Sequence, residues 1–142
     1  MQYRSIFVGF YLLLSIISFN DVLAQQEIVD DSLVFAQIAF EKTYHNFRDM
    51  NQGEKAEHFF EFKNIGKAPL VLNNVLSTCG CTVPEWPREP ILPDSISHIK
   101  VVFDSTSKIG RQNKVITIRS NSRDGDFRLR ISAMVLPPSK RE

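Results

Sequence analysis

Apolar and polar residues alternate with a period of two in several short segments of this chain. The pattern is most regular from Phe127 to Val135, where every second residue is apolar, and it recurs over 56–63 and 95–104. Such alternation predicts half-buried β-strands, because successive side chains of a strand point to opposite faces of its sheet. Several strands of this kind bury their apolar sides when two sheets pack face to face. The pattern therefore predicts a β-sandwich.

Turn-forming residues separate the alternating segments. Further strand candidates are found at 33–40, 70–76 and 113–120. The stretch Asn121–Gly125 predicts a hairpin, because Asp-Gly readily supplies positive φ. Four prolines between residues 84 and 93 exclude a central strand there, because proline has no N–H to donate. The sequence thus predicts an all-β, immunoglobulin-like β-sandwich of about seven antiparallel strands, and it shows no convincing amphipathic helix.

The N-terminus has the features of a secretory signal peptide. One positive charge at Arg4 precedes an apolar, uncharged run from Ile6 to Phe19, and Val22 and Ala24 fit a signal-peptidase site. We expect cleavage between Ala24 and Gln25. The alternative is a membrane anchor, but the run is shorter than the ~20 residues that a spanning helix needs. The expected organisation is a signal peptide (1–24), a flexible leader (25–33), the sandwich domain (34–137) and a C-terminal tail (138–142).

Charge and hydropathy narrow the expected location and partners. The chain has 17 Lys and Arg against 16 Asp and Glu, a net charge of +1. This balance argues against nucleic acid as a partner, because neutralising phosphates requires a basic face. Arg128 and Arg130 are interpreted as a solvated strand face. No second apolar run follows the signal peptide, so we expect a periplasmic or secreted protein without a membrane span.

The segment Ser77–Pro87 contains the only two cysteines and the only tryptophan of the chain. In an extended strand, residues two apart have Cα atoms ~6.6 Å apart, whereas a disulfide requires Cβ atoms ~3.8 Å apart. Cys79 and Cys81 can therefore form a bridge only if the chain kinks, which Gly80 permits. So short a loop gives a bridge only about 1.5 kcal/mol of stabilisation in the loop-entropy model.

Several roles remain open for this pair. The cysteines can shape a turn after a strand, bind a soft metal ion such as Cu(I), exchange disulfides, or link two chains. A zinc site is disfavoured because no second paired ligand motif is present, and His45, His58 and His98 are scattered in the sequence. The motif of possible function comprises Cys79, Gly80, Cys81, Thr82, Pro84, Trp86 and Pro87.

Trp86 has two possible roles. Flanked by Pro84 and Pro87, it can present a recognition surface, because an aromatic ring supplies a large contact area at low entropic cost. Alternatively it covers one end of the sandwich as part of the core, which is the more usual place for a large aromatic side chain.

Four blocks of the sequence carry a family resemblance. They are Phe60–Leu72, Ser77–Pro87, Val102–Ser105 with Gly110, and Ile118–Asn121. These blocks resemble the bacterial family called domain of unknown function 1573, over about Ile38 to Leu136. The resemblance implies a sandwich similar to those of pilus chaperones and sperm proteins, and export in Bacteroidetes-like bacteria. It implies no activity.

No catalytic triad, loop carboxylate pair or phosphate-binding glycine loop stands out. The leading hypothesis is therefore an exported, non-enzymatic module that binds or assembles with another envelope protein, through an exposed strand edge. No cofactor is expected under this hypothesis. The alternative is a metal-binding or thiol-redox protein centred on Cys79 and Cys81, with a soft ion such as copper as the cofactor.

Overall fold

The structure, a computed structural model, describes residues 34–138 of the chain. It contains eight strands: β1 (Ile38–Phe40), β2 (Tyr44–Asn51), β3 (Lys55–Asn64), β4 (Leu72–Ser77), β5 (Thr82–Glu85), β6 (Ile96–Asp104), β7 (Gly110–Ser120) and β8 (Phe127–Leu136). Within the described residues, no helix is long and apolar enough to cross a membrane. The predicted signal peptide, the leader and the tail beyond Pro138 lie outside the described residues.

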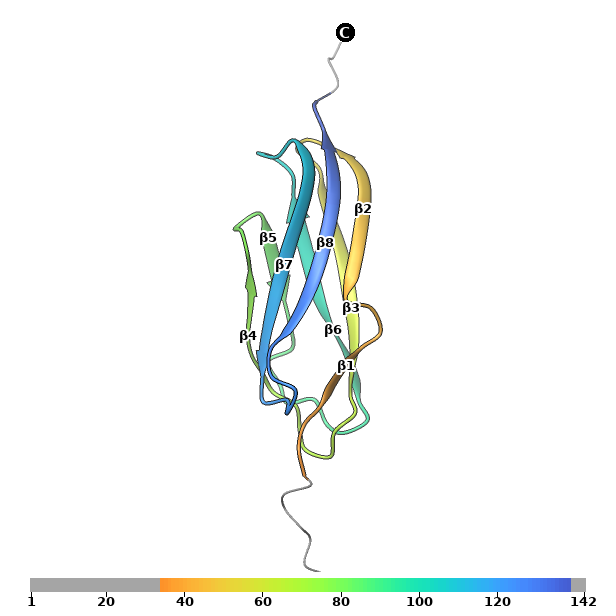
Figure 1. Ribbon diagram of the computed structural model, residues 1–142, viewed down its shortest axis with the longest axis vertical. Helices are drawn as coiled ribbons and strands as arrows, with labels where there is room; N and C mark the ends of the chain where they lie inside the picture. The colour runs from red at the N-terminus through yellow and green to blue at the C-terminus, as the bar shows by residue number, and fades with distance from the viewer. Residues whose placement is uncertain (1–33, 139–142) are drawn as a thin grey trace, which may run out of the picture. The chain divides into compact units, whose positions relative to one another are not determined.

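The strands form two four-stranded sheets (Figure 1). One has the order β1-β3-β6-β5 and is called the β3–β6 sheet; the other has the order β2-β8-β7-β4 and is called the β7–β8 sheet. This arrangement corresponds to the two sheets of an immunoglobulin-like sandwich, with the first strand divided between both sheets. The predicted all-β, immunoglobulin-like fold is confirmed. It has eight strands rather than about seven, and β2 pairs with β8 in parallel, not antiparallel.

The strand that the sequence did not predict is β2, and a β-bulge explains why. Asn46 pairs with Ser132 and Asp49 pairs with Met134, so β2 contains one residue more than β8 over this interval. Arg48 takes up the extra residue with a positive φ of 61°. A bulge interrupts the two-residue alternation by which a strand is found in a sequence.

Two strand boundaries also differ from the prediction. β7 begins at Gly110, inside a stretch expected to be a polar loop, and Gly110 pairs with Val135 of β8. Leu70 was expected in the strand that became β4, but it forms an isolated bridge with Ile91 instead. Backbone pairing extends beyond the apolar residues in the first case and stops short of them in the second.

The core lies between the two sheets, where the alternation predicted it. The inward positions of β3, β6, β7 and β8 supply nearly all of it, and each is opposed by an inward residue of the neighbouring strand. The fully buried apolar side chains are Phe60, Phe62, Leu70, Ile99, Val101, Phe103, Ile116, Ile118, Leu129, Ile131 and Val135. This layer fixes the register of the central strands, because a slip by one residue would expose it.

Candidate functional site

The Cys-Gly-Cys motif lies where the chain crosses from one sheet to the other. β4 ends the β7–β8 sheet at Ser77, and β5 begins the edge of the β3–β6 sheet at Thr82. Between them, Cys79 and Cys81 form a disulfide with Cα atoms 5.3 Å apart, closer than residues two apart in an extended strand. Gly80 does not adopt a positive φ, and a Cβ built on it would meet nothing within 4 Å.

Hydrogen bonds hold this crossing in place. The Cys79 N–H donates to Ser77 Oγ at 3.4 Å, and the Thr82 N–H donates to the Cys79 carbonyl at 3.3 Å. The Asp104 N–H donates to the Cys81 carbonyl at 2.8 Å, which ties the crossing to β6. The buried Thr82 hydroxyl lies 3.7 Å from Cys79 Sγ and 4.0 Å from Cys81 Sγ. The motif is therefore a closed turn whose sulfur atoms are bonded to each other.

The metal-binding alternative is not favoured by this geometry. Soft metal ions bind thiolates, but both sulfur atoms of the motif are engaged in the disulfide. Among residues 34–138, no group of three or more His, Cys, Asp or Glu side chains could hold a metal ion. Of the three histidines, His98 packs edge-on against Phe59 at 5.2 Å, on β6 and away from the other two.

Trp86 follows β5 and is partly buried against the hydrophobic core. Its ring is also covered from outside by Arg88, whose guanidinium carbon lies 3.7 Å from the ring centroid. Its Nε1 is buried without a hydrogen-bond partner in the described part of the chain. Pro87 lines a shallow hollow with Trp86, Phe59 and His98. Trp86 therefore contributes to the core and is not presented as a bare surface ring.

His45 and His58 come together although they are distant in the sequence. Their rings stack with centroids 3.7 Å apart and an interplanar angle of 10°, joining β2 of one sheet to β3 of the other. Burial lowers the pKa of the His45 imidazole. Burial also lowers the pKa of His58, and the nearby charges of His45 and Lys42 lower it further. Both rings are therefore held toward the neutral form.

The backbone beside the motif differs between the two edge strands that meet there. The Thr78 N–H donates to the Val115 carbonyl of β7, so alternation directs the N–H groups of Val75 and Ser77 away from β7. No described strand pairs with that side of β4. β4 thus presents an edge with main-chain donors and acceptors, and Leu76 beside them is 44% exposed.

The neighbouring edge, β5, presents no such donors. Because the Asp104 N–H donates to the Cys81 carbonyl, alternation turns Thr82 and Pro84 outward. Pro84 has no N–H, and the Thr82 N–H is already bonded to the Cys79 carbonyl. A proline at an outward edge position is a recognised protection of an edge strand against pairing.

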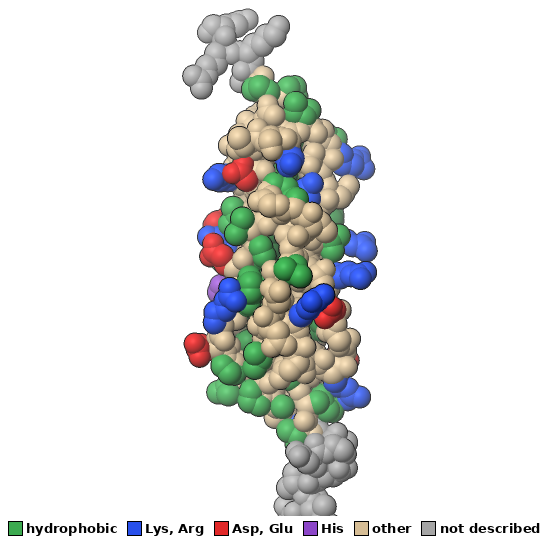
Figure 2. All heavy atoms as spheres, turned by 90° about the vertical axis from the view of Figure 1, so that its left-hand side faces the viewer, with side chains coloured by type: hydrophobic (Ala, Val, Ile, Leu, Met, Phe, Trp, Pro, Cys, Tyr) green, Lys and Arg blue, Asp and Glu red, His purple; other side chains and the backbone are tan. Residues whose placement is uncertain are grey.

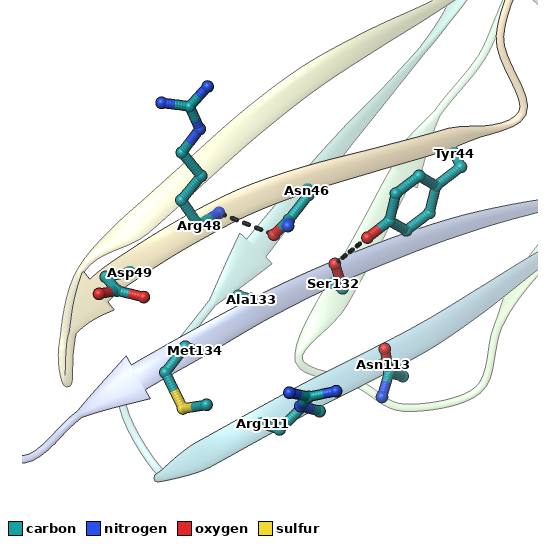
Figure 3. A pocket seen from close by; sticks show the side chains of 9 residues that line it. All are labelled: Tyr44, Asn46, Arg48, Asp49, Arg111, Asn113, Ser132, Ala133 and Met134. Atoms are coloured by element: carbon teal, nitrogen blue, oxygen red, sulfur yellow. Dashed lines mark hydrogen bonds between the residues drawn. The ribbon is translucent and has the colours of Figure 1, made fainter.

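The two edges on the far side are short or irregular. β1 has three residues, and its Ile38 N–H donates to Ser122 Oγ at 3.2 Å. β2 contains the bulge at Arg48, whose N–H donates to Asn46 Oδ1 at 2.9 Å (Figure 3). Bulges and short edges hinder pairing with another chain. Of the four edges in the described part of the chain, β4 alone combines a regular ladder with unprotected donors.

Comparison with known proteins places the domain in a family. Residues 38–135 match the family model described as "Protein of unknown function (DUF1573)". The chain belongs to this family. The resemblance seen in the sequence is thereby confirmed, over nearly the same residues. No curated protein matches the sequence.

Solved structures share the fold at low sequence identity. A protein of unknown function from Porphyromonas gingivalis W83 has a TM-score of 0.64 and 18% identity, over 72% of this chain and 48% of that one. The ASH/PapD-like domain 7 of human CEP192 has a TM-score of 0.61 and 12% identity, over 74% and 89%. The YadV chaperone has a TM-score of 0.50 and 16% identity, over 75% and 55%. The chain thus spans about half of the Porphyromonas protein, and the likeness shows the fold alone.

Proposed function

We propose that this member of the family is an exported, non-enzymatic binding module of the bacterial envelope. In this proposal it accepts an extended segment of another envelope protein along β4, as an added strand of the β7–β8 sheet. The single observation that carries the proposal is the outward-facing backbone of Val75 and Ser77, which no described strand pairs. Main-chain hydrogen bonds would supply affinity, and side chains at alternate positions would supply specificity.

The surroundings of β4 support this mode of binding. Figure 2 shows the side of the molecule on which β4 and β5 lie, where hydrophobic side chains and uncharged surface occupy most of the middle. Charged side chains are what edge strands commonly use to repel a partner. β4 itself, from Leu72 to Ser77, contains no charged residue and no proline. An incoming strand would therefore meet hydrogen-bonding groups and the exposed Leu76 without having to desolvate a charge.

The comparisons support the proposal only at the level of fold. One of the structures with this fold is that of a chaperone, YadV, and another is a PapD-like domain. A sandwich with an accessible edge is a general scaffold for holding extended polypeptide. The proposal for the present chain rests on its own β4 edge, because sequence identities of 12–16% carry no function across.

The experiment places a photo-crosslinking residue on each of the two neighbouring edges. Leu76 of β4 and Val83 of β5 are similarly exposed, at 44% and 53%, and each is replaced in turn in cells of the source organism. We expect irradiation to link a specific envelope protein to position 76 and not to position 83. Mass spectrometry of the adduct should map the link to an extended segment. The intact mass of the purified mature protein should begin at Gln25.

A second variant tests the main-chain bonding itself. Ser77→Pro removes an outward N–H from β4, as Pro84 naturally does on β5, and should abolish the adduct at position 76. Circular dichroism and thermal unfolding of this variant establish that the sandwich is intact. Equal adducts at both positions, or an adduct at 76 that Ser77→Pro leaves unchanged, would refute strand addition at β4.

A further inference from the structure

The outer faces of the two sheets differ in how their charges are paired. On the β3–β6 sheet and its loops, three lysines each meet a carboxylate at 3.0–3.2 Å. The pairs are Lys55 with Asp104, Lys63 with Asp94, and Lys100 with Glu57. Cations on this side are thus largely neutralised by the chain's own acids.

The β7–β8 sheet shows the opposite arrangement. Arg111, Arg128 and Arg130 are exposed on its outer face, and none has a carboxylate within ion-pair distance among residues 34–138. Only Arg119, at the end of the row, meets an acid, at 3.6 Å from Asp126. Figure 2 sees both sheets edge-on: blue side chains predominate along the right-hand margin, whereas red, blue and purple mix along the left. Since the net charge of the whole chain is only +1, this concentration reflects placement and not composition.

A hollow of about 640 Å³ lies among these arginines and is called the Arg130 hollow. Arg128 and Arg130 line it together with Tyr44 and Asn113, and no Asp or Glu is among its lining residues. The two arginines are two positions apart on one strand face, which separates their Cα atoms by only ~7 Å. Their mutual repulsion would be relieved by an anion bound between them. Guanidinium groups bind carboxylate, sulfate and phosphate oxygens in a bidentate manner.

A second hollow, of about 300 Å³, continues along the sheet and is called the Arg111 hollow (Figure 3). It shares Tyr44 and Asn113 with the first. Figure 3 shows Tyr44 projecting from β2 toward Ser132 of β8, and their hydroxyl oxygens lie 2.6 Å apart. Arg111 comes from β7, and its cross-strand partner Met134 is four positions beyond Arg130 on β8, ~14 Å along the strand. Neutral hydrogen-bonding groups therefore separate two positively charged ends.

We propose that these two hollows form one binding groove for an acidic polysaccharide, a sugar chain that carries carboxylate or sulfate groups. An acid group binds between Arg128 and Arg130, and a second one binds at Arg111. The hydroxyls of the intervening sugars bind Asn113 and Ser132, and a sugar ring packs on Tyr44, whose side chain is 53% exposed. This site lies on the sheet face, whereas the proposed strand addition uses the edge of β4, so the two proposals are independent.

The arrangement favours a sugar chain over other anionic partners. A membrane surface would be met best by a flat basic face with exposed large apolar residues, but this face is hollowed and carries neutral hydroxyl and amide groups between its charges. An acidic peptide would bind most strongly through its main chain at a strand edge, and β2, which borders the groove, has a bulge there. Alternating cationic and hydroxyl-binding positions beside an aromatic ring suit a polymer of acidic sugars.

Binding is measured by isothermal titration with polygalacturonate and dextran sulfate as probes, and with uncharged dextran as the neutral control. We expect both acidic polymers to bind, with affinity that falls as salt is added, and dextran not to bind. Arg128→Gln combined with Arg130→Gln should weaken binding at least about tenfold, because two charge-assisted contacts are lost. Tyr44→Ala should weaken it more than Tyr44→Phe, which keeps the ring.

The matched control removes two positive charges from the other sheet, as Lys63→Gln combined with Lys100→Gln. It has the same net charge as the arginine variant and should keep its affinity within about twofold. A similar loss in both double variants would show attraction by net charge alone and overturn the groove. Equal or tighter binding of polyglutamate, or of vesicles containing phosphatidylglycerol, would overturn the assignment to a sugar chain. All substituted side chains are at the surface, and thermal unfolding verifies the fold of each variant.

Discussion

The two sides of the sandwich, where the chain passes from one sheet to the other, are built differently. On the first-strand side, residues 35–40 are tied to both sheets: Ile65 and Lys67 donate backbone bonds to Gln37 and Phe35, and Ile38 donates to Ser122. On the β4–β5 side, the crossing is a short turn closed by a disulfide between residues two apart. One side is secured by buried polar bonding. The other is secured locally, which leaves the β4 backbone available.

The largest expected difference between the sides is at their glycines. A Cβ on Gly66 would lie 2.3 Å from the Phe35 carbonyl oxygen and 2.5 Å from the Gln37 nitrogen, so Gly66→Ala must displace the first-strand segment. We expect a loss of about 3 kcal/mol in the free energy of unfolding, measured with urea. Gly80→Ala on the β4–β5 side meets nothing within 4 Å and should change stability by less than about 0.5 kcal/mol. Equal effects would contradict the comparison.

Buried polar side chains give the next largest contrast. Asn64 is fully buried; its Oδ1 accepts from Gly66 at 3.0 Å, and its Nδ2 donates to the carbonyls of Ala68 and Ile91 at 2.9 Å. Asn64→Ala leaves these groups unsatisfied and should cost about 2 kcal/mol. Asn64→Asp keeps the size but replaces the donor, so it should also destabilise if hydrogen bonding, and not volume, is responsible.

Thr82 is the matching residue on the β4–β5 side. It is also buried, but its hydroxyl contacts only the two sulfur atoms, at 3.7 and 4.0 Å. Thr82→Val should therefore be nearly neutral, because both the hydroxyl and its weak partners lose little. A loss from Thr82→Val as large as that from Asn64→Ala would show that the crossing turn is as important to stability as the first-strand segment.

The disulfide should have a smaller effect than Asn64. Cys79→Ser combined with Cys81→Ser opens a loop of only three residues, for which the loop-entropy model gives at most about 1.5 kcal/mol. We expect a loss of about 1 kcal/mol in urea, with the β-sheet circular dichroism unchanged. A loss of about 3 kcal/mol or more would make this bridge a principal support of the sandwich. Preserved crosslinking at position 76 in this variant would show that β4 pairing does not depend on the bridge.

Much of the fold could be predicted from the sequence because most strands are half-buried. β3, β6 and β8 each expose one side and bury the other, so their alternation survives in the sequence. β2 was missed because the bulge at Arg48 breaks the period, and the parallel pairing of β2 with β8 depends on a contact between distant parts of the chain.

The candidate site could be predicted only in part. The spacing of Cys79 and Cys81 identified the motif but left bridged and separate thiols open, since that depends on a local kink. Arg128 and Arg130 were recognised as one strand face. Their relation to Arg111 and Tyr44 follows from cross-strand register, which no local pattern records. Likewise, the histidines that looked scattered include a stacked pair, because β2 and β3 bring His45 and His58 together from different sheets.

That histidine stack gives the smallest expected effect, and it belongs to the first-strand side. The pKa values of His45 and His58 are lowered on folding, chiefly by burial, from an ordinary value of 6.5. Below pH 6.5 the unfolded chain therefore binds protons that the folded chain does not, so stability falls with pH until the lowered folded-state pKa is reached. Above pH 6.5 this contribution is fully present.

The test compares urea unfolding between pH 7.5 and 5.5 for the wild-type protein and two variants. His45→Gln combined with His58→Gln should flatten the decrease, because the pair that resists protonation is gone. His98→Gln, which removes a histidine from the outer face of β6, should leave the decrease as it is in the wild-type protein. If the decrease persists unchanged without His45 and His58, the first-strand side carries no pH-sensitive contact. The difference between the two sides would then rest on hydrogen bonding and packing alone.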